Sequence, residues 1–99
     1  MDILKINGGK LELRRENGSL IRTIVSSGVV DADLNDDGLV VITLLNGKVE
    51  LRRDNGSLIC TIVSSNALSA RWRGDDIAIR LNNGKIELRN SRGSYIRTI

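Results

Sequence analysis

Two aspartates, Asp31 and Asp33, are the nearest that this chain comes to a catalytic pair of carboxylates. Side chains two residues apart share one face of a β-strand, so the two could act together as acid and base. The same spacing is common on ordinary strands, however. The 99-residue chain also has no histidine and one cysteine, so it lacks an imidazole base and cannot build a thiolate zinc site. The sequence therefore predicts a non-enzymatic protein without a cofactor.

Arg71, Trp72 and Arg73 are a second candidate, because in an internal repeat they take the positions of residues 33–35, Asp-Leu-Asn. A tryptophan between arginines can stack on a base or another ring-shaped ligand. A tryptophan at a leucine position is more often core, with the arginines reaching solvent. A third interpretation pairs Arg71 with the aspartates of a neighbouring repeat. The candidate ligand- or partner-binding residues are thus Asp31, Asp33, Arg71, Trp72 and Arg73.

A possible calcium loop is formed by Asp33, Asn35 and Asp37, which place side-chain oxygens at alternate positions before a glycine. The closing glutamate of an EF-hand would fall on Leu44, which cannot ligate. Asparagine, aspartate and glycine are also the residues that strand-to-strand turns use. We therefore expect a turn and no metal.

Three Lys-x-Glu-x-Arg ladders repeat along the chain. Stacked arginines could form a stripe that binds phosphates. Alternatively each glutamate compensates its two cations in cross-strand or cross-blade pairs, and repetition in every unit favours this structural role. The ladders are Lys10, Glu12 and Arg14, then Lys48, Glu50 and Arg52, then Lys85, Glu87 and Arg89.

Cys60 stands where the other repeats have arginine, and nothing beside it in the sequence would activate a thiolate, so we expect it to be inert. One cysteine excludes an internal disulfide and fits a reducing compartment. The sequence begins without a signal peptide, and no apolar run approaches the ~20 residues of a membrane span. These features predict a cytoplasmic protein with no membrane association.

The elements that must position these residues come from the repeat. Residues 10–24, 48–62 and 85–99 are nearly the same, with 38 positions from Lys10 to Lys48 and 37 from Lys48 to Lys85. A fixed period of this length is typical of a solenoid or propeller. Each period contains four short strands rich in Val, Ile, Leu and Thr, separated by turns such as Asn-Gly. In the middle repeat we expect strands at Val29–Leu34, Leu39–Leu45, Lys48–Arg53 and Leu58–Val63.

The strands differ in how they should pack. Residues 39–45 are apolar on both faces, the Lys-x-Glu-x-Arg strand has one half-wet face, and residues 29–34 mix small apolar and charged side chains. Sheets stacked face to face around a polar channel produce such a gradient. The pattern predicts an all-β protein with propeller-like, four-stranded antiparallel blades.

The middle repeat, from Val30 to Ile62, resembles a blade of a WD-repeat propeller in its order of strands and turns. It lacks the Gly-His pair and the Trp-Asp pair that mark such repeats. The segment from Asp33 to Gly38 has a weaker resemblance to the loop of FG-GAP propeller repeats, although that loop needs an aspartate where Val41 stands. The resemblance implies blades, without membership of the WD family proper.

Eleven expected strands, from Met1–Ile6 to Ser94–Ile99, make about 2.75 blades at four strands each. We expect one repeat domain, 1–99, divided into a partial blade at 1–25 and blades at 26–63 and 64–99. Such a chain cannot close a ring alone, so the partner it implies is itself, with a dimer slightly favoured over a trimer. The predicted function is a structural or interaction module, a self-assembling propeller fragment that presents loops or a channel to a protein partner. The alternative is a polyanion or nucleic-acid binder using the repeated Arg and Lys positions, which the mild net charge of +3 does not favour.

Overall fold

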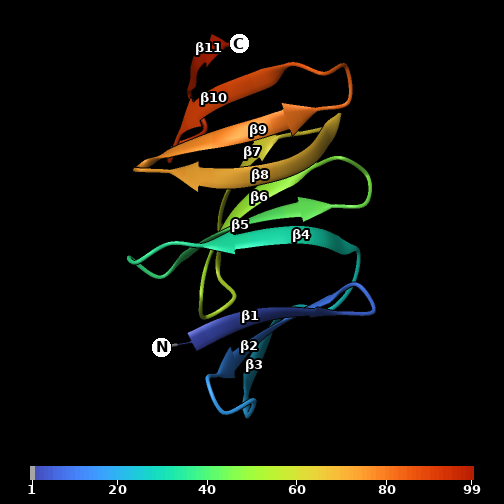
Figure 1. Ribbon diagram of the computed structural model, residues 1–99, viewed down its shortest axis with the longest axis vertical. Helices are drawn as coiled ribbons and strands as arrows, with labels where there is room; N and C mark the ends of the chain where they lie inside the picture. Colours follow the sequence, from blue (N-terminus) through green and yellow to red (C-terminus); the bar gives the residue numbers. More distant parts are fainter. Residues whose placement is uncertain (1) are drawn as a thin grey trace.

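The computed structural model describes residues 2–99. Over this range the chain forms strands and turns, and no helix is long and apolar enough to span a bilayer. The strands make three separate antiparallel sheets stacked along the longest axis of the molecule (Figure 1). The first sheet has the order β1-β2-β3, the second β4-β5-β6-β7, and the third β8-β9-β10-β11. The strands are β1 Asp2–Asn7, β2 Lys10–Arg15, β3 Leu20–Val25, β4 Val29–Leu34, β5 Leu39–Leu44, β6 Val49–Arg53, β7 Leu58–Val63, β8 Ala67–Arg73, β9 Asp76–Leu81, β10 Ile86–Asn90 and β11 Tyr95–Thr98.

Asparagine and glycine end the strands for a physical reason that recurs in each sheet. At the β6–β7 turn, Asn55 Oδ1 accepts a hydrogen bond from the Ser57 backbone N–H at 2.9 Å. Gly56 between them has a φ of 96°, which side chains strain to adopt. This local bond folds the chain back without help from the rest of the protein. The same bond is made by Asn17 to Ser19, Asn46 to Lys48 and Asn83 to Lys85.

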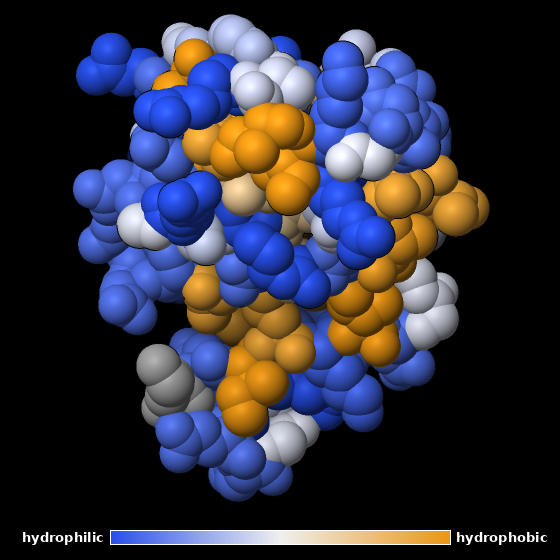
Figure 2. All heavy atoms as spheres, turned by 45° about the horizontal axis from the view of Figure 1, so that its top comes forward, coloured by the Kyte–Doolittle hydropathy of each residue, from blue (hydrophilic) through white to orange (hydrophobic). Residues whose placement is uncertain are grey.

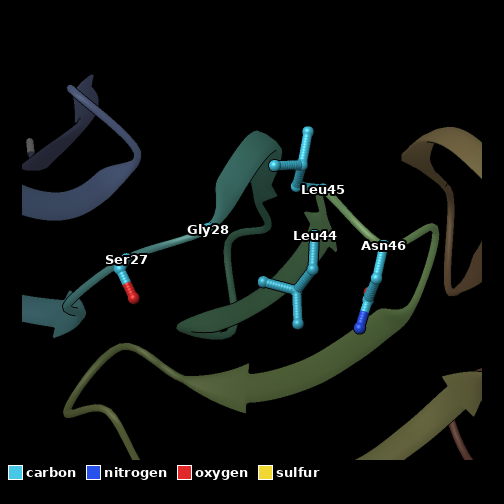
Figure 3. Close-up of a pocket in the computed structure, with 5 residues that line it drawn as sticks. All are labelled: Ser27, Gly28, Leu44, Leu45 and Asn46. Atoms are coloured by element: carbon cyan, nitrogen blue, oxygen red, sulfur yellow. The ribbon is translucent and has the colours of Figure 1, made fainter.

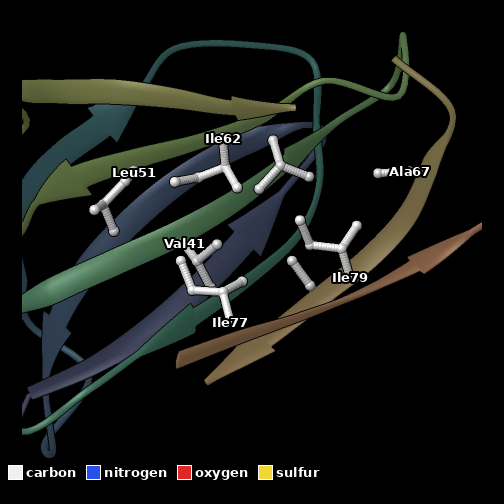
Figure 4. Packing of buried hydrophobic residues seen from close by; sticks show 8 residues of the cluster. Val41, Leu51, Ile62, Ala67, Ile77 and Ile79 are labelled. Carbon is white, nitrogen blue, oxygen red and sulfur yellow. The ribbon is translucent and has the colours of Figure 1, made fainter. Parts of the chain in front are cut away.

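Alternating apolar residues make each sheet two-faced, and the faces of neighbouring sheets join in two cores. β5 serves both, because Val40 and Ile42 face the first sheet while Val41 faces the third. The first core contains Leu11, Leu13, Ile24, Val29, Val40 and Ile42. The second, part of which Figure 4 shows, contains Val41, Val49, Leu51, Ile62, Ala67, Ala70, Ile77 and Ile79.

Hairpin glycines bring each sheet against the linker that enters the next one. The Gly9 carbonyl accepts a hydrogen bond from Val29 N at 2.9 Å, and the Gly47 carbonyl accepts one from Ala67 N at 3.0 Å. A Cβ on Gly47 would lie 2.6 Å from the Asn66 nitrogen, so only glycine fits there without movement. At Gly84, the same position of the third sheet, a Cβ would meet nothing within 4 Å. Within residues 2–99 the third sheet therefore ends the stack with an uncovered face.

The all-β, propeller-like architecture predicted from the repeat is confirmed. The strand bounds differ from the expected ones by one residue at several ends, and Met1 of the predicted first strand lies outside the described residues. As expected, the first sheet lacks an inner strand in residues 2–99, whereas β4 and β8 supply one to the other two. The division at 1–25, 26–63 and 64–99 stays a prediction about domains, although each sheet lies within one of these ranges.

Candidate functional site

The inner strands β4 and β8 bring Arg71 and Asp31 together. Arg71 Nη1 donates a hydrogen bond to Asp31 Oδ2, and also one to the Ala70 carbonyl at 3.0 Å. The hydrogen bond to Asp31 raises the pKa of Arg71, and the charge of Asp33 acts in the same direction. The Arg71 side chain keeps 55% of its surface exposed, against 20% for Asp31. The pair thus fixes a cation at the surface where the second and third sheets meet.

Asp33 and Trp72 form the second link between these strands. Asp33 Oδ2 accepts a hydrogen bond from the Trp72 backbone N–H at 2.9 Å. The Asp33 carbonyl accepts one from the indole Nε1–H at 3.1 Å. Trp72 is half-buried and packs against the core between the second and third sheets. Its ring is therefore part of the core, with its polar edge satisfied, as one of the sequence interpretations had it.

Arg73, the remaining predicted binding residue, lies apart from this cluster. It is exposed and borders a hollow of about 270 Å³ together with Asp76 and the apolar Leu88, Ile96 and Ile99. Four of the five candidate residues therefore form a cluster at the junction of the second and third sheets. The fifth, Arg73, lies at the end of the stack that the third sheet forms.

The three residues of the possible calcium loop have protein partners or face away. Asn35 Oδ1 accepts hydrogen bonds from the backbone N–H groups of Asp37, at 3.0 Å, and Leu39, at 2.9 Å. Asp33 Oδ2 accepts a hydrogen bond from the Trp72 backbone N–H, and Asp37 is exposed. These contacts are those of a turn, in which the oxygens hold the backbone.

The Lys-x-Glu-x-Arg ladders pair along each strand, so the expectation of cross-strand or cross-blade pairs was wrong. Arg52 Nε donates to Glu50 Oε1 at 3.2 Å, and its Nη1 donates to the Gly56 carbonyl at 2.8 Å. Lys48 also lies 3.4 Å from Glu50. The arginine reaches its own hairpin turn, so it stays on its own strand. The same two contacts join Arg14 to Glu12 and Gly18, and Arg89 to Glu87 and Gly93.

Cys60 is half-buried beside the core of the second and third sheets. Burial raises the pKa of its thiol above the ordinary value, which lowers the fraction of reactive thiolate at neutral pH. The environment therefore opposes nucleophilic chemistry at this residue.

A hollow of about 310 Å³ lies at the end of the second sheet, where the linker from β3 meets the β5–β6 turn (Figure 3). It is lined by Ser27, Gly28, Leu44, Leu45 and Asn46, none of which titrates. Leu45 is 80% exposed, the most of any large apolar residue among those described. This surface can make contacts but offers no group for chemistry.

Comparison with known proteins bears on the fold. The crystal structure of Sqt1 from Saccharomyces cerevisiae, a WD-repeat propeller protein, is similar to this chain with a TM-score of 0.75 and 18% identity. The match covers 98% of this chain and 29% of that one. The three sheets are propeller-like blades. At this identity the similarity establishes the fold alone, and the chain spans less than a third of the length of Sqt1. No protein-family model matches the sequence, and the search of curated proteins finds no match.

The two ends of the stack carry exposed apolar residues. Ile3, Ile86 and Ile99 are exposed apolar residues of the first and third sheets. Figure 2, in which the third sheet is turned forward, shows apolar atoms gathered among hydrophilic ones. These isoleucines occupy repeat positions that are buried elsewhere in the chain.

Proposed function

We propose that the chain is a non-enzymatic interaction module, a propeller fragment that assembles with a second copy and presents its loops or a central channel to a protein partner. The third sheet of one copy stacks on the first sheet of the other. Each chain brings about 2.75 blades, so two copies approximate six blade positions.

The observation that supports this proposal is that equivalent residues of the repeats are exposed in the third sheet but buried in the second. Ile86 is 39% exposed, whereas Val49, its counterpart in the second sheet, is 0% exposed. Ile99 is 64% exposed, whereas its counterpart Ile62 is 4% exposed. Within the chain a following sheet covers these positions. Covering one isoleucine fully contributes roughly 1.5–3 kcal/mol, so the open end favours a partner that supplies the same kind of sheet.

The two ends also carry charges that set the strength of the contact. In the β1–β2 hairpin Lys5 pairs with Glu12. At the position equivalent to Lys5, the second sheet has Ile42 and the third sheet has Ile79. In the third sheet Arg80 pairs with Ile86. In the second sheet the equivalent pair is Thr43 and Val49, so Arg80 takes the place of an uncharged residue. An inward charge on an open sheet opposes indiscriminate stacking. We therefore expect a specific assembly, and Arg80→Thr should strengthen it.

Sedimentation velocity on matched variants tests the proposal. Ile86→Asp places a charge on the open face of the third sheet, and should shift the protein to a monomer without unfolding it. Leu58→Asp is the control, since Leu58 is 52% exposed on the outer strand of the middle sheet. It should leave the assembly unchanged. Equal sedimentation of both variants and the original chain would contradict stacking through this face.

The polyanion-binding alternative rests on the ladder arginines, and their contacts do not support it. Arg14, Arg52 and Arg89 each hold a glutamate and a glycine carbonyl of their own strand and turn. Binding a phosphate would require the arginine to share or leave these partners.

A further inference from the structure

We propose that an extended, basic peptide segment binds beside β1 and supplies the inner strand that the first sheet lacks within residues 2–99. The segment would have small or apolar residues in its first half and arginine or lysine at its end. The site is built within one chain, so it goes beyond the self-assembly proposed above and does not depend on it.

The vacancy lies along one edge of β1. In the second and third sheets, β5 and β9 each pair with an inner strand on one side and with another strand on the other side. β1 holds the same place in the first sheet, but within residues 2–99 it pairs with β2 alone. Alternate residues of an antiparallel edge strand direct their N–H and C=O groups away from the sheet. β1 therefore presents a row of free backbone groups to the vacant position.

The second sheet provides a wall beside this edge. β1 is in contact with β4, the inner strand of the second sheet, as their positions in Figure 1 also show. Val29 of β4 belongs to the core that the first and second sheets share, and the partly buried Ala32 and Leu34 pack against it. A strand added to β1 would extend this core along its open side, in the way that β8 packs against β4 one sheet further on.

The chemistry of the segment follows from the acidic end of the site. A hollow of about 300 Å³ lies between Asp2, at the start of β1, and the turn that follows β4, and it is also lined by Asp36 and Asp54. A strand antiparallel to β1 finishes where β1 begins, so its last residues reach this hollow. Asp2 stands opposite Arg15 in the β1–β2 register, whereas within residues 2–99 no ion pair joins Asp36 or Asp54. A cationic end complements these carboxylates.

The chain contains an example of such a segment. β8, from Ala67 to Arg73, is an inner strand with buried alanines near its start and two arginines at its end, one of which binds Asp31 of β4. The matching segment around β4 has the same position in its sheet but carries two aspartates. The two segments give a basic probe and an acidic control of equal length, Ser65–Arg73 and Ser27–Asn35.

The first measurement is fluorescence anisotropy of labelled peptides with these two sequences, titrated with the whole chain at low salt. We expect the basic peptide to bind about tenfold more tightly than the acidic one, because each exposed ion pair adds a small increment. The double variant Asp36→Asn, Asp54→Asn should remove most of this advantage. Equal affinity of the two peptides, or a preference that survives the double variant, would overturn the proposed acidic end.

Backbone methylation of the basic peptide tests the strand pairing. In β8 the Trp72 N–H points out of the sheet to Asp33, so the N–H groups of residues 71 and 73 are the ones directed at β9. N-methylation at residue 71 should therefore abolish binding to β1, and N-methylation at residue 72 should leave most of it. Equal effects of the two, or no binding of the unmodified peptide, would refute strand addition. Sedimentation of the peptide-free chain reports self-assembly separately, so failure of one proposal does not imply failure of the other.

Discussion

Three alanine substitutions at equivalent hairpin glycines measure how closely the sheets stack. Gly9, Gly47 and Gly84 have nearly the same φ, 83°, 84° and 86°, so alanine meets the same left-handed backbone at each. That backbone costs roughly 1–2 kcal/mol for a side-chain-bearing residue. The space around them differs, since a Cβ would lie 2.6 Å from a backbone nitrogen at Gly47, 3.3 Å at Gly9, and beyond 4 Å of any atom at Gly84.

Gly47→Ala must also move the linker into the third sheet and weaken the Ala67 N–H to Gly47 carbonyl bond, which adds about 2–3 kcal/mol. At about 4–8 °C per kcal/mol for a domain of this size, Gly47→Ala should melt roughly 10–20 °C below Gly84→Ala, with Gly9→Ala between them. Thermal unfolding followed by far-ultraviolet circular dichroism provides the measurement. Equal melting temperatures for the three variants would refute the close stacking of the sheets.

Other changes have distinct expected outcomes. Thr43 is fully buried, and its Oγ1 has no hydrogen-bond partner among the described residues, so Thr43→Val should raise the free energy of unfolding by about 1 kcal/mol, measured by urea denaturation. Asp33→Ala should destabilise the protein by about 1–2 kcal/mol, because it removes the acceptor of the Trp72 N–H. Asp31→Ala should change stability by less than about 1 kcal/mol, because its partner Arg71 is exposed. The reverse order would contradict the roles given to these two carboxylates. Since burial raises the pKa of the Cys60 thiol, iodoacetamide should alkylate it more slowly at pH 8 in the folded chain than in urea, and equal rates would contradict that environment.

The repeat was sufficient to predict the blades because the sequence signals are local. Asn-Gly turns and alternating apolar residues determine strand positions without reference to distant parts of the chain, as the bond from Ser57 N–H to Asn55 shows. The pairing of Arg71 with Asp31 was one of three interpretations, since it depends on how two sheets meet. The direction of the ladder pairs was missed because an arginine on a strand can reach several partners. Arg52 bonds Glu50 on its own strand because the Gly56 carbonyl holds its other end.

The register of β1 was also outside what the sequence could predict. Aligning Gly9-Lys10 with Gly47-Lys48 in the sequence makes Leu4 the equivalent of Ile42. In the structure the β1–β2 turn is one residue shorter than the β5–β6 turn, because Asn7 pairs with Lys10. The shift moves Lys5 into the register of Ile42. A one-residue change in a turn exchanges the faces of a strand, so it changes the surface that the first sheet offers to a partner.

Self-assembly through the ends of the stack is tested most directly by the absolute mass of the protein in solution. Sedimentation equilibrium at micromolar concentration should give the mass of two 10.9 kDa chains. The mass should fall to that of one chain for Ile86→Asp while the β spectrum is retained. A stable mass of one chain for the unmodified protein at these concentrations would contradict the assembly.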